Sequence, residues 1–149
     1  MSGRVNLLDT NIWLALAVSS HAFHAPAESW MKTQAHPKST LFCRATQQSL
    51  LRLLTTEKVM DPFGLPAMTN SNAWAEFDRL MLDPRIFLAP EPSDLDKFWK
   101  GFTTRHTASP KMWMDAYLAA FAVAGNYKLI TADKAFAQYP GLDLHVLTL

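Results

Sequence analysis

The stretch VNLLDTN, residues 5–11, places a short apolar run directly in front of an acid, and a helical pattern follows at once. Residues 5–8 have the character of a buried strand, and Asp9 ends the run. A carboxylate at the end of a buried strand is costly unless it has a partner. The stretch therefore predicts a strand-to-helix unit of an α/β fold. It also suggests that Asp9 has a partner or a function at the end of the strand.

The same alternation of apolar runs and helical patterns continues along the chain. Strands are expected at residues 5–8, 40–43, 85–89, 128–131 and 144–149. Helices are expected at residues 10–18, 24–35, 45–56, 68–83, 92–106, 111–126 and 133–139. Short, almost wholly apolar strands separated by helices are typical of a parallel sheet covered on both faces. We expect the first strand at the centre of that sheet, with right-handed crossovers.

Two of the helices show start signals and a buried face. Thr69 or Ser71 is expected to cap the helix at 68–83, and Ser93 the helix at 92–106. The predicted inward-facing residues are Trp74, Phe77, Leu80 and Met81 in the first helix and Leu95, Phe98, Trp99 and Phe102 in the second. The helix at 111–126 is apolar almost all round and should end at Gly125-Asn126.

Length and composition indicate one soluble domain over residues 1–149. The chain has 14 basic and 13 acidic residues, so its net charge of +1 neither indicates nor excludes a nucleic-acid partner. Cys43 is the single cysteine, and in the apolar run TLFC it is interpreted as a buried structural thiol. No stretch resembles a signal peptide or a membrane helix, so we expect a cytoplasmic protein with no membrane partner.

Three aspartates are expected at one edge of the predicted sheet. Asp9 follows the first strand, Asp133 follows the run KLIT at one remove, and Asp115 lies in the first turns of the apolar helix that leads into that run. Ligands bind outside the carboxyl ends of the strands in such sheets. Each acid alone can be explained as a helix cap or a partner of the helix dipole. Three acids at one edge instead favour a divalent cation such as Mg²⁺, as in nucleases and phosphatases.

The motifs around these acids resemble those of PIN-domain ribonucleases, and more narrowly of the VapC toxins of bacterial toxin–antitoxin pairs. The similar segments are LLDTNIWLALA at 7–17, ATQQSLLRLLT at 45–55 and MDAYLAAFAVAGNYKLITADKAFAQYPGLDLHVL at 114–147. Any one motif is weak, but the ordered set is specific. The resemblance implies a three-layer α/β/α fold with a central parallel sheet of four to five short strands.

The resemblance also implies an activity and partners. It implies an endoribonuclease that depends on Mg²⁺ or Mn²⁺ and leaves a 3′ hydroxyl and a 5′ phosphate. It further implies a homodimer and a cognate VapB-like antitoxin. By position, Asp9, Asp115 and Asp133 match the metal-binding and catalytic acids of the family. Thr131 matches a polar residue beside the last acid, and Asn11 matches one after the first.

One position departs from the family pattern. Many PIN domains have a glutamate three residues after a threonine of the third helix, and here the residue three after Thr46 is Ser49. Gln47 or Gln48 could hold a metal-bound water instead, or both could lie on an exposed helix face. Arg52 is interpreted either as a clamp for phosphate or the acids, or as a solvated side chain. Whether one or two metal ions bind stays open.

Five further polar residues are candidates for RNA contact or ordinary surface residues: His21, His24, Arg105, His106 and Lys111. The spacing of the histidines does not favour a zinc site. Two alternative functions remain. The missing glutamate favours a catalytically weak PIN-like domain that binds RNA or protein. The acids on a parallel sheet would also suit a metal-dependent phosphatase or a receiver-like domain, although the stretch LLDTN lacks the second acid that a receiver needs.

Overall fold

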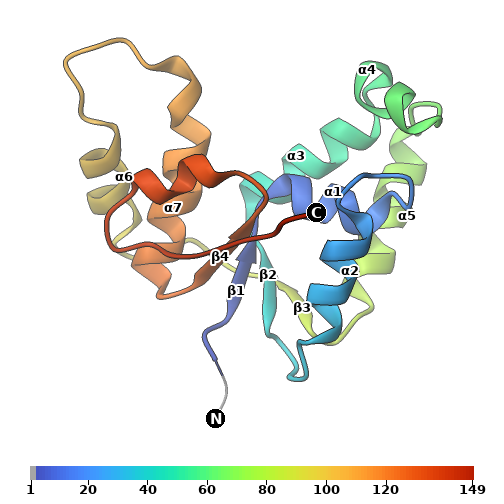
Figure 1. Cartoon of the computed structure of the whole chain (residues 1–149), viewed down its shortest axis with the longest axis horizontal. Helices are drawn as coiled ribbons and strands as arrows, with labels where there is room; N and C mark the ends of the chain where they lie inside the picture. Colours follow the sequence, from blue (N-terminus) through green and yellow to red (C-terminus); the bar gives the residue numbers. More distant parts are fainter. Residues whose placement is uncertain (1–2) are drawn as a thin grey trace.

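A five-stranded parallel sheet with helices on both faces forms the centre of the computed structural model, which describes residues 3–149 (Figure 1). The strands run in the order β3-β2-β1-β4-β5, and every neighbouring pair is parallel. Their bounds are β1 Asn6–Leu8, β2 Thr40–Phe42, β3 Ile86–Leu88, β4 Lys128–Thr131 and β5 Asp143–Val146. The predicted three-layer α/β/α fold and the central first strand are both confirmed.

Each of the three inner strands buries consecutive side chains on opposite faces of the sheet, because side chains alternate along a strand. In β1, Leu8 packs into the core beneath α1, whereas Leu7 packs into the core beneath α7. The same split separates Phe42 from Leu41 in β2 and Ile130 from Leu129 in β4. Burial of each such side chain contributes about 1.5–3 kcal/mol relative to exposure. This two-sided burial explains why the strands are short and almost wholly apolar.

The first face of the sheet is covered by α1 Thr10–Ala17, α2 His24–Lys32, α3 Arg44–Leu54 and α5 Asn70–Met81. Trp13 of α1 stacks on Phe42 with ring centroids 3.7 Å apart, and Phe77 of α5 also packs against Phe42. Thr69 caps α5, as predicted, because its hydroxyl accepts from the Asn72 amide. The short α4 Glu57–Met60 and the 3-10 turn η1 Asp61–Phe63 follow α3 and had no predicted counterpart.

The second face is covered by α6 Leu95–Thr103 and α7 Trp113–Gly125 (Figure 1). The 3-10 turn η2 Pro110–Met112 precedes α7, and a second one, η3 Lys134–Gln138, follows β4. The middle of α7 is buried on all sides, from Ala116 to Ala122. The helix ends as predicted: Asn126 adopts the left-handed conformation, and any Cβ on Gly125 would overlap the Tyr127 ring.

Several details of the prediction are wrong. Trp74 is 50% exposed and contacts the Phe77 ring edge-on, whereas Phe77 and Leu80 are buried as predicted. Ser93 does not cap α6, which begins at Leu95 without a side-chain cap. That helix ends at Thr103 and not at residue 106. Directly after its end, the Thr104 hydroxyl donates a hydrogen bond to the Lys100 carbonyl. The segment 133–139 is a 3-10 turn and not an α-helix.

Within residues 3–149, the helices are all too short or too polar to span a membrane.

Candidate functional site

The three predicted acids reach the carboxyl edge of the sheet from three elements. Asp9 follows β1 directly, Asp133 follows β4 by two residues, and Asp115 lies in the first turn of α7. Strands β1 and β4 are neighbours in the sheet, so their carboxyl ends lie side by side. The negative charges of Asp9 and Asp133 both raise the pKa of Asp115, as expected of carboxylates that face the same edge of the sheet.

Asp9 is a largely buried carboxylate held by two hydrogen bonds. The Thr10 amide donates to its Oδ1 over 2.8 Å, and the Thr131 hydroxyl donates to its Oδ2 over 2.8 Å. Burial raises the pKa of Asp9, the two hydrogen bonds work against that rise, and the charge of Asp133 adds to it. The net shift is upward, so the bonds orient the carboxylate without compensating for its burial.

Thr131 connects two of the acids. Its buried hydroxyl donates to Asp9 and accepts from the Asp133 amide over 3.1 Å. Asp133 is itself fixed as the cap of η3, because the Ala135 amide donates to its Oδ1 over 2.9 Å. The buried Thr131 thus orients the Asp9 carboxylate and also holds the backbone amide of Asp133.

Asp115 has no comparable partners. Its carboxylate makes no hydrogen bond and no ion pair with any group in residues 3–149, although it is half-buried. Burial raises its pKa first, and the charges of Asp9 and Asp133 raise it further. Lying near the N-terminus of α7, it gains some stabilisation from the helix dipole. Within the described chain, the three acids therefore form a site of like charges with no basic side chain paired to them.

A divalent cation with oxygen ligands fits this donor set. Asp9, Asp115 and Asp133 offer carboxylate oxygens, which are the ligands that Mg²⁺ and Mn²⁺ prefer. In residues 3–149 no three His, Cys, Asp or Glu side chains converge tightly enough to form a finished ligand cluster. That spacing is expected of bare carboxylates, because like charges repel one another. Mg²⁺ is usually held by one or two carboxylates with waters completing its shell, so a finished cage is not required.

Within residues 3–149, the predicted residues of the third helix form no hydrogen bond or ion pair with these acids. Gln47 is buried, contrary to the exposed alternative, and accepts from Arg44 over 2.6 Å. Gln48, Ser49 and Arg52 line a separate pocket of about 480 Å³. Arg52 is exposed and forms no ion pair within residues 3–149, so the predicted salt bridge to the acids is absent there. Asn11, in the first turn of α1, is likewise exposed.

Two of the candidate RNA contacts, His21 and His24, make local contacts at the turn between α1 and α2. The His24 ring bonds to the Ala15 carbonyl over 2.7 Å and to Glu28 over 2.9 Å. The His21 ring accepts from the Phe23 amide and stacks on Phe63 with centroids 5.1 Å apart. The structure therefore gives both histidines a local structural role.

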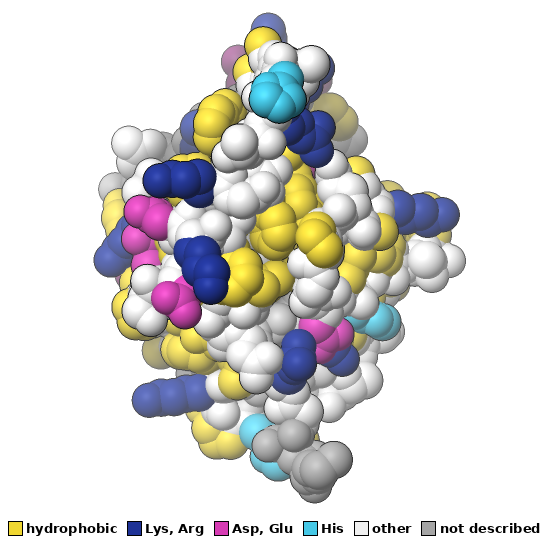
Figure 2. Space-filling view, turned by 90° about the vertical axis from the view of Figure 1, so that its left-hand side faces the viewer, with side chains coloured by type: hydrophobic (Ala, Val, Ile, Leu, Met, Phe, Trp, Pro, Cys, Tyr) yellow, Lys and Arg dark blue, Asp and Glu magenta, His cyan; other side chains and the backbone are white. Residues whose placement is uncertain are grey.

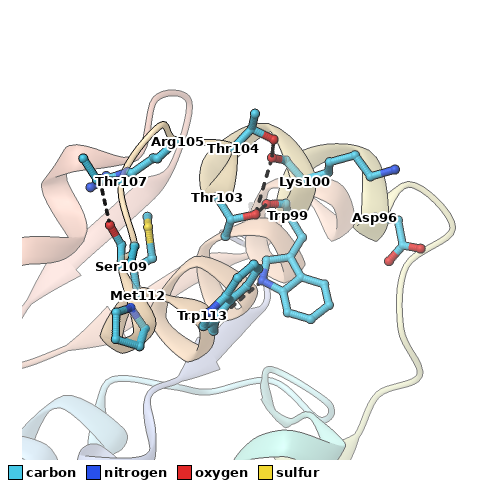
Figure 3. Close-up of a pocket in the computed structure, with 12 residues that line it drawn as sticks. Asp96, Trp99, Lys100, Thr103, Thr104, Arg105, Thr107, Ser109, Met112 and Trp113 are labelled. Atoms are coloured by element: carbon cyan, nitrogen blue, oxygen red, sulfur yellow. Dashed lines mark hydrogen bonds between the residues drawn. The ribbon is translucent and has the colours of Figure 1, made fainter.

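Arg105, His106 and Lys111 lie on the exposed segment between α6 and α7. This segment covers a pocket of about 720 Å³ whose walls include Trp99, Trp113 and Arg105 (Figure 3). Apolar side chains gather on this side of the molecule with Lys and Arg side chains around them (Figure 2), and Trp113 is 54% exposed. None of the three aspartates lines the pocket.

Tyr139 feels the charges of two of the acids and was not singled out from the sequence. Burial raises the pKa of its hydroxyl most. The negative charges of Asp115 and Asp133 raise it further, and the positive charge of Arg105 lowers it. The hydroxyl is buried and has no hydrogen-bond partner in residues 3–149. The only signal in the sequence was a tyrosine directly before Pro140-Gly141, and that pattern is equally typical of an ordinary turn.

Known proteins are similar to this chain in sequence and in fold. A family model described as PIN domain matches residues 7–142. The chain is 51% identical over 142 residues to Ribonuclease VapC41 of Mycobacterium tuberculosis, in an alignment that covers 95% of this chain and 97% of that protein. Its fold resembles that of VapBC2 from Rickettsia felis bound to a promoter DNA fragment, with a TM-score of 0.64, 15% identity and coverage of 97% and 99%. It also resembles VapC20 of Mycobacterium tuberculosis, a toxin that cleaves the Sarcin-Ricin loop, with a TM-score of 0.62, 18% identity and coverage of 93% and 97%.

Proposed function

Because the chain belongs to the PIN-domain family, in its VapC branch, we propose that it is a toxin ribonuclease whose acidic edge cleaves RNA with a divalent cation. The observation that supports this most strongly is the set of three unneutralised aspartates at the carboxyl edge of the sheet. Buried carboxylates with only like charges around them are unfavourable. They are retained where a positively charged ligand is to be bound.

We propose that Asp9, Asp115 and Asp133 hold Mg²⁺, with Mn²⁺ as the alternative ion. A bound divalent cation would lower the pKa of a coordinated water and stabilise charge on the phosphate oxygens. The residues of the chain supply orientation. Thr131 and the Thr10 amide fix the Asp9 carboxylate, and Thr131 also holds the backbone of Asp133. Asp133 is the exposed acid of the three, and we assign it the role of orienting the attacking water.

Cleavage of a structured RNA by the purified chain tests this proposal. Cleavage should require Mg²⁺ or Mn²⁺, stop on addition of a chelator, and be lost in Asp9→Asn. Asp78→Asn, which removes an exposed acid from α5, is the matched control and should cleave as the wild type does. Cleavage that persists in chelator, or in Asp9→Asn, would reject the metal-dependent mechanism.

The absent helix-three glutamate supports one alternative. Ser49 lies at that position and lines a pocket that none of the three aspartates lines, so the site has three acids instead of four. A chain that binds the RNA but does not cleave it under any metal condition would be a PIN-like binding domain. Three acids favour one firmly held ion, and a calorimetric titration with Mn²⁺ would give the number bound.

A VapB-like antitoxin and a second copy of the chain are the proposed protein partners. Support for the antitoxin comes from the fold comparison, which includes VapBC toxin–antitoxin structures. The homodimer is proposed from the resemblance to the family alone. We propose that the activity acts on RNA in the cytoplasm. Co-expression with an antitoxin encoded beside this chain should yield a complex in which cleavage is inhibited. Light scattering of the isolated chain should give twice the mass of one copy, and a monomeric mass would reject the homodimer.

A further inference from the structure

Tyr139 places a hydrogen-bond donor without an acceptor beside the acidic edge. Its side chain is 5% exposed, and its hydroxyl has no partner in residues 3–149. Leaving a buried hydroxyl unpaired is unfavourable, and phenylalanine would fill the same space without that cost. A tyrosine at this position therefore calls for an acceptor in some state of the protein.

The unpaired acceptor that shares its surroundings is Asp115. The Asp115 carboxylate makes no hydrogen bond within the described chain, and its charge is the foremost electrostatic influence on the pKa of the Tyr139 hydroxyl. A donor without an acceptor and an acceptor without a donor thus lie in one site. A carboxylate has about four lone-pair positions, so it can bind a cation and accept from a tyrosine at the same time.

The Tyr139 ring is held in place by its surroundings. It packs against Phe102 of α6 with centroids 5.2 Å apart and against Phe136 of η3 at 6.2 Å. Its neighbour Gln138 accepts from the Arg105 guanidinium over 3.0 Å, which ties η3 to the segment between α6 and α7. Arg105 lies at the end of that segment's pocket away from Lys100 and Asp96 (Figure 3).

We propose that the Tyr139 hydroxyl is a positioning group of the acidic edge, which donates a hydrogen bond to the Asp115 carboxylate when a divalent cation is bound there. This inference rests on the proposed metal-dependent activity. The bond would select one orientation of a carboxylate that otherwise has no partner. Groups that orient metal ligands in this way typically account for about 10- to 100-fold in metal affinity or activity.

The test is Tyr139→Phe, which keeps the ring and removes only the hydroxyl. We expect the dissociation constant for Mn²⁺, measured by calorimetry on the full chain, to rise about tenfold or more. The Mn²⁺ concentration for half-maximal RNA cleavage should rise in parallel. The unfolding temperature in chelator should be unchanged or higher, because the lost hydroxyl was unpaired.

Tyr127→Phe is the matched control, because Tyr127 follows the opposite end of α7 and stacks on Phe121. It should leave Mn²⁺ affinity unchanged. If Tyr139→Phe binds Mn²⁺ as tightly as the wild type, the inference is rejected while the proposed function stands. If the wild type binds Mn²⁺ but cleaves no RNA, the proposed function fails and the comparison of affinities still decides the role of Tyr139. A lower unfolding temperature with unchanged affinity would mark Tyr139 as a packing residue only.

Discussion

Two groups of charged residues at opposite edges of the sheet are treated in opposite ways. At the amino edge, just before β3, Arg85 donates to both carboxylate oxygens of Asp83 over 2.6–3.2 Å. This guanidinium lowers the pKa of Asp83, although partial burial opposes the shift. At the carboxyl edge, burial and like charges raise the pKa of Asp9 and Asp115, and neither acid is paired with a basic side chain of the described chain.

We interpret the difference as one between an acid that supports the fold and acids that are proposed to bind a cation. Arg85 also donates to the carbonyls of Met31 and Gln34, so the pair at the amino edge joins the end of α2 to the start of β3. The chain contains 14 basic residues, yet none of them pairs with Asp9 or Asp115 within residues 3–149. In the proposed function, leaving these acids unpaired keeps the carboxylates available for a cation at some cost in stability.

The largest expected effect comes from Asp115→Asn. Removing one of three ligands should lower the rate of RNA cleavage about 1000-fold or more, because a bound cation supplies several kcal/mol of charge stabilisation. Gel-based cleavage of a structured RNA at saturating Mg²⁺ measures it. Normal cleavage by this variant would remove the distinction between the two edges.

Thr131→Val should have the next largest effect. It removes the hydroxyl that joins Asp9 to the Asp133 amide, and losses of about 10- to 100-fold in cleavage are typical for such orienting groups. Thr40→Val is the matched control, since Thr40 is a buried strand threonine at the amino edge. The same assay compares both variants, and equal losses would show that the effect is one of packing.

Arg85→Gln tests the other edge. It should lower the free energy of unfolding by about 1–2 kcal/mol, because it removes hydrogen bonds to Asp83, Met31 and Gln34. Urea unfolding measures the change. Cleavage per folded molecule should equal that of the wild type. A strong loss of activity without a loss of stability would contradict a purely structural role for this edge.

The smallest effect concerns the pH dependence of that pair. Since the folded pKa of Asp83 is lowered, its contribution to stability is fully present above its unfolded pKa of about 3.9 and is lost as the pH falls through the folded value. Asp83→Asn lacks this contribution at every pH. The difference in unfolding free energy between wild type and Asp83→Asn should be present at pH 6 and shrink towards pH 3. A constant difference would mean that the charge of Asp83 is not responsible.

The sequence predicted the parts of this molecule that follow from topology. Buried strands define the parallel sheet, and the parallel sheet places residues that follow β1 and β4 at one edge, so strand order alone assigns Asp9 and Asp133 to that edge. Asp115 could be singled out because it is the one acid in an apolar helix. These inferences need only strand direction and periodicity.

The remaining features depend on packing that no local pattern encodes. Trp74 has the spacing of a buried residue, yet half of its surface stays exposed. Gln47 is buried and accepts from Arg44 across the first turn of α3, a contact that depends on the side-chain conformations of both residues. Tyr139 shares the site of Asp115 through the fold of η3. Its ring is buried by packing against Phe102, a residue far away in the sequence. A similar long-range contact joins Arg105 to Gln138.

Thermal unfolding of the wild type and of Asp115→Asn, each in chelator and in Mn²⁺, tests the central claim most directly. The claim is that the acids at the carboxyl edge are unfavourable alone and are stabilised by a divalent cation. In chelator, Asp115→Asn should unfold at the same temperature as the wild type or a higher one. Mn²⁺ should raise the unfolding temperature of the wild type, because it binds only the folded state, and should leave that of the variant almost unchanged. If Mn²⁺ stabilises neither protein, or both equally, the acidic edge is not a cation site.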